Sequence, residues 1–274
     1  MALDGGPGTG ARQATIRDSN LGLVLRTVCA APEPLTRADV AARTGTARAT
    51  ATRLVHDLVA GGLLDEAGRS VAGRPGRPGT PLLPGASVVA LGLQVDADVL
   101  AARAVDLRGR VVGEVVEDGD LVGSDPAATL ERLARHAREV LAGLPSGVEV
   151  ATAGLALPGL VDAASGTLLH APNLGWRDVR PADALRAALP EAPAPSVGNE
   201  ANLAARAVSE QAPGRPGRLR DFLYLSGQVG IGGAVVLDGR ALGGSSGWAG
   251  EVGHVPVDPA GPACPCGSTG CLER

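Results

Sequence analysis

The sequence predicts two parts, a small and mostly α winged helix-turn-helix followed by a larger α/β domain. Three helical stretches, two of them separated by a tight turn, lie between residues 19 and 61. From residue 88 the pattern changes to strands of alternating apolar and polar residues, with amphipathic helices between them. A stretch rich in glycine, proline and arginine separates these patterns. We therefore predict domains at 17–84 and 85–274.

The charge is unevenly distributed along the chain. Its 274 residues have a formal net charge of −4 and contain no lysine. Between residues 17 and 80, however, nine arginines outnumber six acidic residues, so only this segment favours a polyanion as partner. We find no apolar run long enough to cross a membrane and no signal-like N-terminus, so we expect a cytoplasmic protein without a membrane partner.

The first two helices are predicted by apolar spacing and by capping residues. Residues 19–31 repeat apolar side chains at helical intervals, and Ser19 or Asn20 can cap their start. Cys29 falls on the apolar side of this helix, where we expect a core thiol. A second helix is predicted after Thr36 as its N-cap, and Gly45 suits the left-handed turn that ends it.

The third helix has a polar face suited to the major groove of DNA. Thr46 is the predicted N-cap, and Gly61 closes the helix. Opposite the apolar stripe there is no carboxylate before Asp57, and arginine and threonine can reach base edges or phosphates. The face consists of Arg48, Ala49, Thr52, Arg53 and His56, and the predicted DNA contacts are Thr46, Arg48, Thr52 and Arg53.

A short hairpin is predicted to follow the third helix. Its tip is rich in glycine and proline and carries Arg69, Arg74 and Arg77. We interpret it as a wing that lies along the DNA backbone or in the minor groove. The alternative is a three-helix protein-interaction module with a solvated polar face, although the arginine-rich tip favours double-stranded DNA.

The second domain alternates strands and helices in the manner of an α/β fold. Three strands form a predicted antiparallel meander, and an amphipathic helix and a buried strand follow them. Further on, a short strand leads into a helix that begins near Asn199, and two strands flank a glycine-rich turn. The predicted meander strands are 88–95, 99–106 and 111–116.

A cluster of metal-ligand residues ends the sequence. His254, Cys264, Cys266 and Cys271 follow the spacing His-x9-Cys-x-Cys-x4-Cys. Three thiolates and one imidazole suit tetrahedral zinc, and the intervening glycines allow tight turns. The alternative is a set of free or oxidised thiols, which a reducing compartment makes the weaker interpretation.

Several motifs from residue 88 onward resemble the ROK family of bacterial repressors and sugar kinases. They are "HAPNLGW" (170–176), "VGNEANLAA" (197–205), "LSGQVGIGGAVVLDG" (225–239) and "GEVGHVPVDPAGPACPCGSTGCLE" (250–273). Residues 17–84 look like the winged helix-turn-helix of the repressor branch. The resemblance implies an actin-like, ribonuclease-H-like fold of the sugar-kinase type, with a first lobe at about 85–210 and the start of a second at 211–274.

The resemblance also implies roles for individual residues. The four residues of the terminal cluster would bind a structural zinc ion. Carboxylates and carboxamides would meet sugar hydroxyls, which both donate and accept hydrogen bonds. Taken alone, Asn199 fits a helix N-cap equally well and Glu251 a surface charge. The predicted sugar set is Asn173, Asn199, Glu200, Glu251, His254 and Glu273.

The kinase features of the family are altered in this sequence. The family's phosphate-binding turn corresponds to Gln94, Asp96, Ala97 and Asp98, where two carboxylates would repel ATP. Glu200 stands where family kinases have an aspartate base, and a displacement of about 1 Å can cost a hundredfold in rate. The glycine-rich turn at 226–233 is retained. We therefore expect that the protein is not an enzyme, and the altered turn argues against ATP binding.

The expected function is a DNA-binding repressor of carbohydrate metabolism. Its partners would be operator DNA and a sugar or sugar-phosphate effector, and it would act as a homodimer or higher homo-oligomer. One alternative is a sugar kinase for hexoses or N-acetylhexosamines with an appended DNA-binding module. Another is a non-functional remnant.

The resemblance further implies that family members continue beyond the zinc loop. On this expectation the chain is truncated at its C-terminus, and apolar strand faces at 222–225 and 234–237 would be uncovered. Reduced stability or aggregation would follow.

Overall fold

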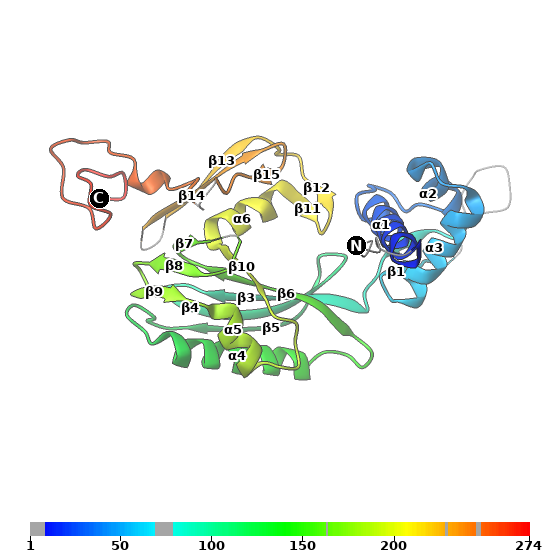
Figure 1. The fold of residues 1–274 in the computed structure, drawn as a ribbon, viewed down its shortest axis with the longest axis horizontal. Helices are drawn as coiled ribbons and strands as arrows, with labels where there is room; N and C mark the ends of the chain where they lie inside the picture. Colours follow the sequence, from blue (N-terminus) through cyan, green and yellow to red (C-terminus); the bar gives the residue numbers. More distant parts are fainter. Residues whose placement is uncertain (1–8, 69–78, 163, 228–229, 245–247) are drawn as a thin grey trace, which may run out of the picture. The chain divides into compact units, whose positions relative to one another are not determined.

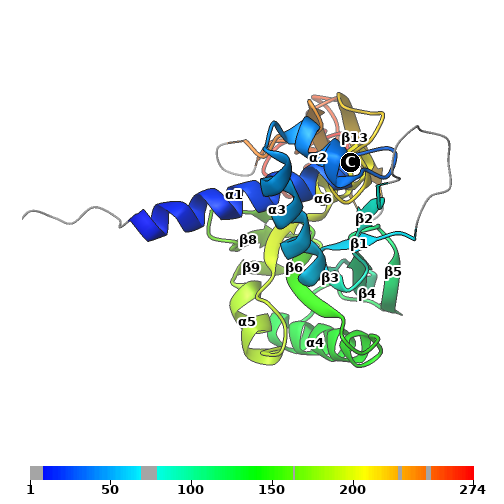
Figure 2. The same ribbon diagram turned by 90° about the vertical axis from the view of Figure 1, so that its right-hand side faces the viewer.

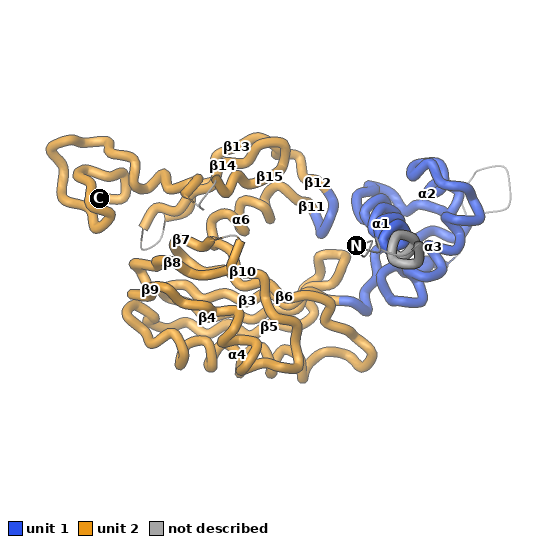
Figure 3. Tube along the Cα trace, in the orientation of Figure 1, with its two compact units in different colours: residues 1–88, 212–215 blue, residues 89–211, 216–274 orange. Residues whose placement is uncertain are grey.

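The computed structural model describes residues 9–68, 79–162, 164–227, 230–244 and 248–274. The chain divides into two compact units, coloured separately in Figure 3. Unit 1 comprises residues 1–88 and 212–215, and unit 2 comprises 89–211 and 216–274. No helix in the described ranges is both long and apolar enough to cross a membrane.

Unit 1 is a helix-turn-helix with a β-hairpin. Helix α1 packs against α2 and α3, as Figure 2 shows. Val24, Val40 and Leu54 are among the side chains of one buried core. Strands β1 and β2 pair antiparallel, which confirms the stem of the predicted hairpin. The elements are α1 (Thr9–Cys29), α2 (Arg37–Thr44), α3 (Arg48–Ala60), β1 (Leu64–Glu66) and β2 (Leu82–Pro84).

Both ends of α2 follow the predicted signals. Thr36 accepts a hydrogen bond from the backbone N–H of Asp39, and the Asp39 carboxylate accepts one from the backbone N–H of Thr36. This capping box fixes the start of α2. Gly45 has a φ of 67°, the left-handed conformation that ends the helix.

Two helix starts differ from the predictions. Helix α1 begins at Thr9, so Ser19 and Asn20 lie inside it and cap nothing. The N-cap of α3 is Ala47, which makes no side-chain capping bond. The Thr46 hydroxyl instead lies 2.9 Å from the hydroxyl of Thr44, so the predicted Thr46 cap is wrong.

The first part of unit 2 is a five-stranded sheet with the order β10-β6-β3-β4-β5. Figure 1 shows α4 and α5 on one face of this sheet and α6 on the other. Leu91, Leu100 and Leu133 belong to the large core under α4. The predicted bounds of β3 and β4 are confirmed, and β5 is two residues longer. The elements are β3 (Val88–Val95), β4 (Val99–Asp106), β5 (Val111–Asp118), α4 (Pro126–Ala142), β6 (Glu149–Leu157), β10 (Ser196–Asn199) and α6 (Glu200–Ser209).

A small antiparallel sheet and a short helix stand between β6 and β10. Each strand has only two to four residues, and the sequence predicted none of them. Trp176 on β9 is buried and donates its indole N–H to the carbonyl of Ser124 at 2.8 Å. The elements are β7 (Leu160–Val161), β8 (Leu168–Ala171), β9 (Trp176–Val179) and α5 (Pro181–Ala188).

The last part of unit 2 is a three-stranded antiparallel sheet with the order β13-β14-β15. Helix α6 packs on one face, where Phe222, Tyr224 and Val236 form a small core with Ala205. The remaining elements of unit 2 are β13 (Phe222–Gly227), β14 (Ile231–Leu237), β15 (Arg240–Ala241) and the 3-10 turn η1 (Val252–His254). A separate two-stranded sheet, β11 (Glu210–Ala212) and β12 (Arg215–Pro216), includes residues of both units.

The two faces of this sheet differ in exposure. Three leucines on the face opposite α6 are more than half exposed: Leu223 by 54%, Leu225 by 54% and Leu237 by 51%. The expected uncovered apolar surface is therefore present on one face only.

Candidate functional site

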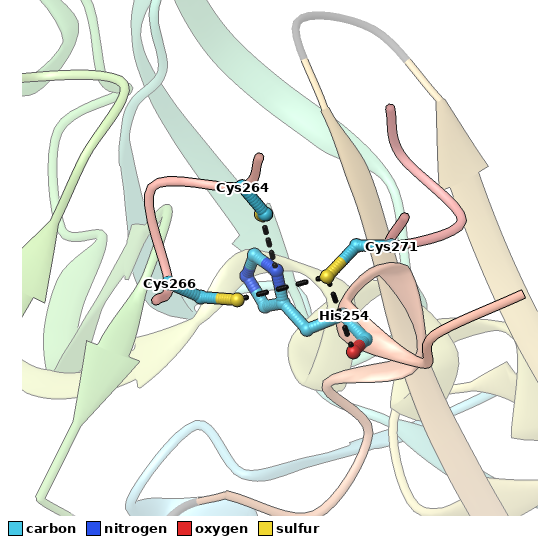
Figure 4. Close-up of side chains that lie close together, drawn as sticks. All are labelled: His254, Cys264, Cys266 and Cys271. Atoms are coloured by element: carbon cyan, nitrogen blue, oxygen red, sulfur yellow. Dashed lines mark hydrogen bonds between the residues drawn. The ribbon is translucent and has the colours of Figure 1, made fainter. Parts of the chain in front are cut away.

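The four residues of the terminal cluster come together around one point (Figure 4). Their ligand atoms all lie within 4.8 Å of one another. His254 Nδ1 is 3.6 Å from Cys264 Sγ, and Cys266 Sγ is 3.6 Å from Cys271 Sγ. Within the described residues, this is the cluster of three or more histidine, cysteine or acidic side chains that could hold a metal ion.

The cluster fits zinc in both its donor set and its spacing. Zn–S bonds of about 2.3 Å and Zn–N bonds of about 2.0–2.1 Å place tetrahedral ligand atoms about 3.5–3.8 Å apart. The two 3.6 Å separations match this spacing. Three cysteines and one histidine are also a common structural zinc set, so the donor set fits this ion.

Backbone hydrogen bonds hold the cysteine loop closed. Val257 N–H donates to the Gly270 carbonyl at 2.8 Å, and Cys264 N–H donates to the Ser268 carbonyl at 2.9 Å. Gly270 has a φ of 65°, and a side chain there would overlap the carbonyl oxygen of Asp258. Only glycine fits at this turn, which brings Cys271 back toward His254.

The environments of the thiols differ. Burial raises the pKa of Cys271 to about 11, with hydrogen bonds from the neighbouring thiols adding to the rise. A backbone hydrogen bond from Ser268 lowers the pKa of the exposed Cys266. Because zinc binds thiolates, uptake of the metal must displace the proton of Cys271.

His254 also contacts two residues of the predicted sugar set. Its Nε2 is 3.7 Å from a carboxylate oxygen of Glu251, and its Nδ1 is 3.3 Å from one of Glu273. A Cβ placed on Gly230 would lie 3.2 Å from Glu273 Oε2 and 3.9 Å from Asn173 Nδ2. Glu273 and Asn173 therefore approach the same glycine, and the cluster of His254 with the three cysteines adjoins a group of polar side chains.

Glu200 belongs to a second group, which consists of carboxylates. Burial raises its pKa to about 7, and the nearby charges of Asp96 and Glu251 add to the rise. Burial also raises the pKa values of Asp96 and of Glu251. The proximity of Asp96 to Glu200 was not predicted, because it depends on how the first hairpin faces the start of α6.

Asn199 is the N-cap of α6. Its Oδ1 accepts the backbone N–H of Asn202 at 3.0 Å. Its Nδ2 donates to the carbonyl of Gly159 at 3.0 Å and to a carboxylate oxygen of Glu200 at 3.1 Å. The capping interpretation is therefore confirmed, and Asn199 positions Glu200 at the first turn of the helix.

The turn between β3 and β4 uses its backbone donors internally. Asp96 N–H donates to the Val99 carbonyl at 2.9 Å, and Ala97 N–H donates to the Asp96 carboxylate at 2.7 Å. These two N–H groups are not free for a phosphate. The second glycine-rich turn includes residues 228–229, which lie outside the described residues.

A pocket of about 560 Å³ is lined by residues of β10, α6 and β15. Asn202, Arg206, Arg220 and Arg240 line it together with apolar side chains such as Val197. It shares only Asn199 with the predicted sugar set. Its position therefore differs from that of the carboxylates and the histidine described above.

The predicted DNA face of unit 1 is exposed on α3. Arg48, Ala49, Thr52, Arg53 and His56 all face solvent, while Thr46 is half-buried. The predicted wing contacts Arg69, Arg74 and Arg77 lie outside the described residues.

One ion pair of this face was not predicted. The Asp57 carboxylate, at the far end of α3, is 2.8 Å from the guanidinium of Arg17 on α1. This hydrogen bond lowers the pKa of Asp57. The negative charge that borders the face is thus paired with a cation.

Two family profiles match the sequence. Residues 115–274 match the ROK family, and residues 21–68 match the IclR helix-turn-helix domain. The xylose repressor of Caldicellulosiruptor bescii is 31% identical over 83% of this chain and 56% of its own length.

Solved structures agree with this match. A ROK family transcriptional regulator, a homologue of the Escherichia coli MLC protein, superposes with a TM-score of 0.71 and 26% identity, over 94% of this chain and 64% of that one. The ROK hexokinase of Thermus thermophilus gives 0.54 and 35% identity, over 68% of this chain and 59% of its own. The chain thus spans about three fifths of the length of these relatives.

Proposed function

Because the chain belongs to the ROK family, we propose that it is a DNA-binding transcriptional repressor whose second domain senses a sugar. The observation that carries this proposal is the joining of two modules in one chain. An exposed, arginine-bearing recognition helix in a helix-turn-helix precedes a ROK domain with an adjoining zinc and carboxylate cluster.

In the proposed complex, α3 enters the major groove of operator DNA. Arg48, Thr52 and Arg53 face the groove, and Thr46 at the turn approaches the backbone. The arginines of the hairpin tip, at 69, 74 and 77, bind phosphates. We expect a homodimer or higher homo-oligomer, in which two recognition helices meet two half-sites.

In the proposed sensor, sugar hydroxyls bind between the carboxylates and His254. Glu251 lies beside Nε2 of the His254 imidazole and Glu273 beside Nδ1, and each carboxylate can accept a hydrogen bond from a sugar hydroxyl. Asn173 can donate and accept, Glu200 lies nearby, and Asn199 holds Glu200 in place. A structural zinc ion, when bound, would fix the position of His254. A sugar or sugar phosphate that binds here would change the operator affinity.

The internal hydrogen bonds of the β3–β4 turn support a sensor rather than a kinase. A sugar kinase remains the second candidate on one observation: the pKa of Glu200 lies at about 7, where a general base is effective. The hexokinase similarity agrees with this candidate. An assay of ADP release with hexoses and N-acetylhexosamines separates the two. The repressor proposal predicts no turnover above background, whereas a few turnovers per minute would favour the kinase.

DNA binding is tested by selection from a random duplex library with the full chain loaded with zinc. We expect enrichment of one sequence family. The double variant Arg48→Ala/Arg53→Ala should lose this enrichment, while Arg186→Ala, on α5 of unit 2, should retain it. Equal enrichment by all three proteins would contradict the proposal.

A further inference from the structure

In the N-terminal half of α3, the centre of the exposed face presents the methyl groups of Ala49 and Thr52, and the exposed His56 follows on the same line one turn later. We infer that Ala49 and Thr52 read thymine through its C5-methyl group in the major groove, so that the operator carries thymines under the N-terminal half of α3. This inference rests on the proposed DNA-binding function. It adds the class of base that the helix selects.

The positions of the side chains on the helix place these two residues at the centre. With about 100° of rotation per residue, Thr52 and Ala49 lie between Arg48 on one side and Arg53 on the other. His56 lies between the same flanks, one turn toward the C-terminus. All four side chains are exposed. A helix in the major groove directs the centre of its outer face at the base edges and its flanks toward the walls of the groove. Arg48 and Arg53 are thus placed for phosphates or flanking guanines, and the centre for base edges.

The Thr52 hydroxyl has already used its proton. It donates to the backbone carbonyl of Arg48 at 2.8 Å. A threonine hydroxyl has one proton, so this side chain offers DNA only acceptor lone pairs and its γ-methyl group. While this hydrogen bond is kept, the hydroxyl does not donate to guanine O6, guanine N7 or thymine O4. Both kinds of base pair present an amino donor in the major groove, on adenine or on cytosine, but only an A·T pair adds a methyl group. Contact of the γ-methyl group of Thr52 with thymine is therefore what can select an A·T pair.

Ala49 adds a second methyl group beside the first. It precedes Thr52 by three residues, so the two side chains are neighbours on the helix surface. Ala49 has no polar side-chain atom, and apolar contact with thymine methyl is the one sequence-specific interaction that alanine can make. Together, Ala49 and Thr52 form an apolar strip at the second and fifth positions of α3.

The electrostatics of the surrounding face favour close approach to DNA. Asp57 is the only carboxylate in α3, and Arg17 pairs with it at 2.8 Å. Arg48 and Arg53 carry positive charge on both flanks of the strip. The helix can therefore come near enough to the phosphates for short-range methyl contacts to form.

Uracil in place of thymine tests the inference, because uracil lacks only the C5-methyl group. A duplex site is first selected from a random library with the full, zinc-loaded chain. Each thymine of the site is then replaced by uracil in turn, and affinity is measured by fluorescence anisotropy at one salt concentration. We expect one or two thymines at which the substitution weakens binding about fourfold, the effect of one buried methyl group.

Two variants assign the effect to the two residues. Thr52→Ser keeps the hydroxyl and removes the γ-methyl group, and Ala49→Gly removes the other methyl group. Each should abolish the uracil effect at one thymine. Thr27→Ser is the matched control, because Thr27 on α1 donates to the Leu23 carbonyl at 2.7 Å in the same geometry but lies off the face. The control should retain the full effect.

The outcomes separate this inference from the proposed function. The inference is overturned if uracil does not weaken binding to the selected site, or if it weakens binding by both variants as much as by the parent. Either outcome leaves DNA binding in place. If no sequence is enriched, the proposed DNA-binding function fails and the inference fails with it.

Discussion

Replacement of Glu200 by glutamine removes a buried carboxylate and should make the protein more stable above neutral pH. The pKa of Glu200 is raised from 4.5 to about 7, mainly by burial. Between pH 4.5 and pH 7, Glu200 keeps its proton in the folded state, whereas the unfolded state has released it. The free energy of unfolding therefore falls as pH rises from about 4.5 to 7. This shift corresponds to about 3 kcal/mol as an upper value, because solvent reaches part of the side chain.

Urea unfolding at several pH values measures this effect. The fluorescence of Trp176, which is buried in the same unit, reports the transition. We expect the Glu200→Gln variant to match the parent at pH 4.5 and to exceed it by about 2–3 kcal/mol at pH 8. Glu139→Gln, on the exposed side of α4, is the control and should change little at either pH. The reasoning is refuted if Glu200→Gln leaves the pH dependence of stability unchanged.

Three further predictions concern the zinc ligands, the turn and the recognition helix. Cys271→Ser should weaken zinc binding about a hundred- to a thousandfold in a chelator competition assay. The reason is that a four-ligand site contributes roughly 10–16 kcal/mol in total, of which one ligand accounts for about a quarter. Unchanged zinc affinity would exclude Cys271 as a ligand. Thr36→Ala removes the capping box and should lower the stability of unit 1 by about 1 kcal/mol in urea unfolding, whereas no change would mean that the cap contributes nothing. Arg53→Ala should weaken operator binding by about 1–3 kcal/mol, and affinity equal to that of the parent would remove Arg53 from the interface.

The sequence predicted the elements whose signals are local. Strands β3 and β4 were placed correctly because eight residues of alternation are enough to show a period of two. The two ends of α2 followed from Thr36 and Gly45, whose roles depend on near neighbours alone. Strands β7 to β9 were missed because two to four residues show no period. The start of α1 was missed because the stretch from Thr9 to Asn20 has no apolar stripe to mark a helix.

The candidate site divides in the same way. The spacing of the cysteines predicted their cluster with His254, because residues that are close in sequence on a short, turning loop come together in space. The charge interaction between Asp96 and Glu200 joins segments that are distant in the sequence, and no spacing encodes it. The prediction that Thr46 caps α3 was wrong because its hydroxyl pairs with that of Thr44 instead. The capping preference of threonine does not reveal such a competing partner.

The response of operator binding to sugars tests the central claim most directly. Operator affinity of the zinc-loaded chain is measured by anisotropy without sugar and with D-xylose, D-glucose, N-acetylglucosamine and glucose 6-phosphate. The account predicts that at least one sugar lowers affinity by about 5- to 150-fold, the usual range of coupling between two sites. Glu251→Gln should bind the operator normally but lose this response. Operator affinity that stays the same with every sugar, in protein that binds DNA, would contradict the account.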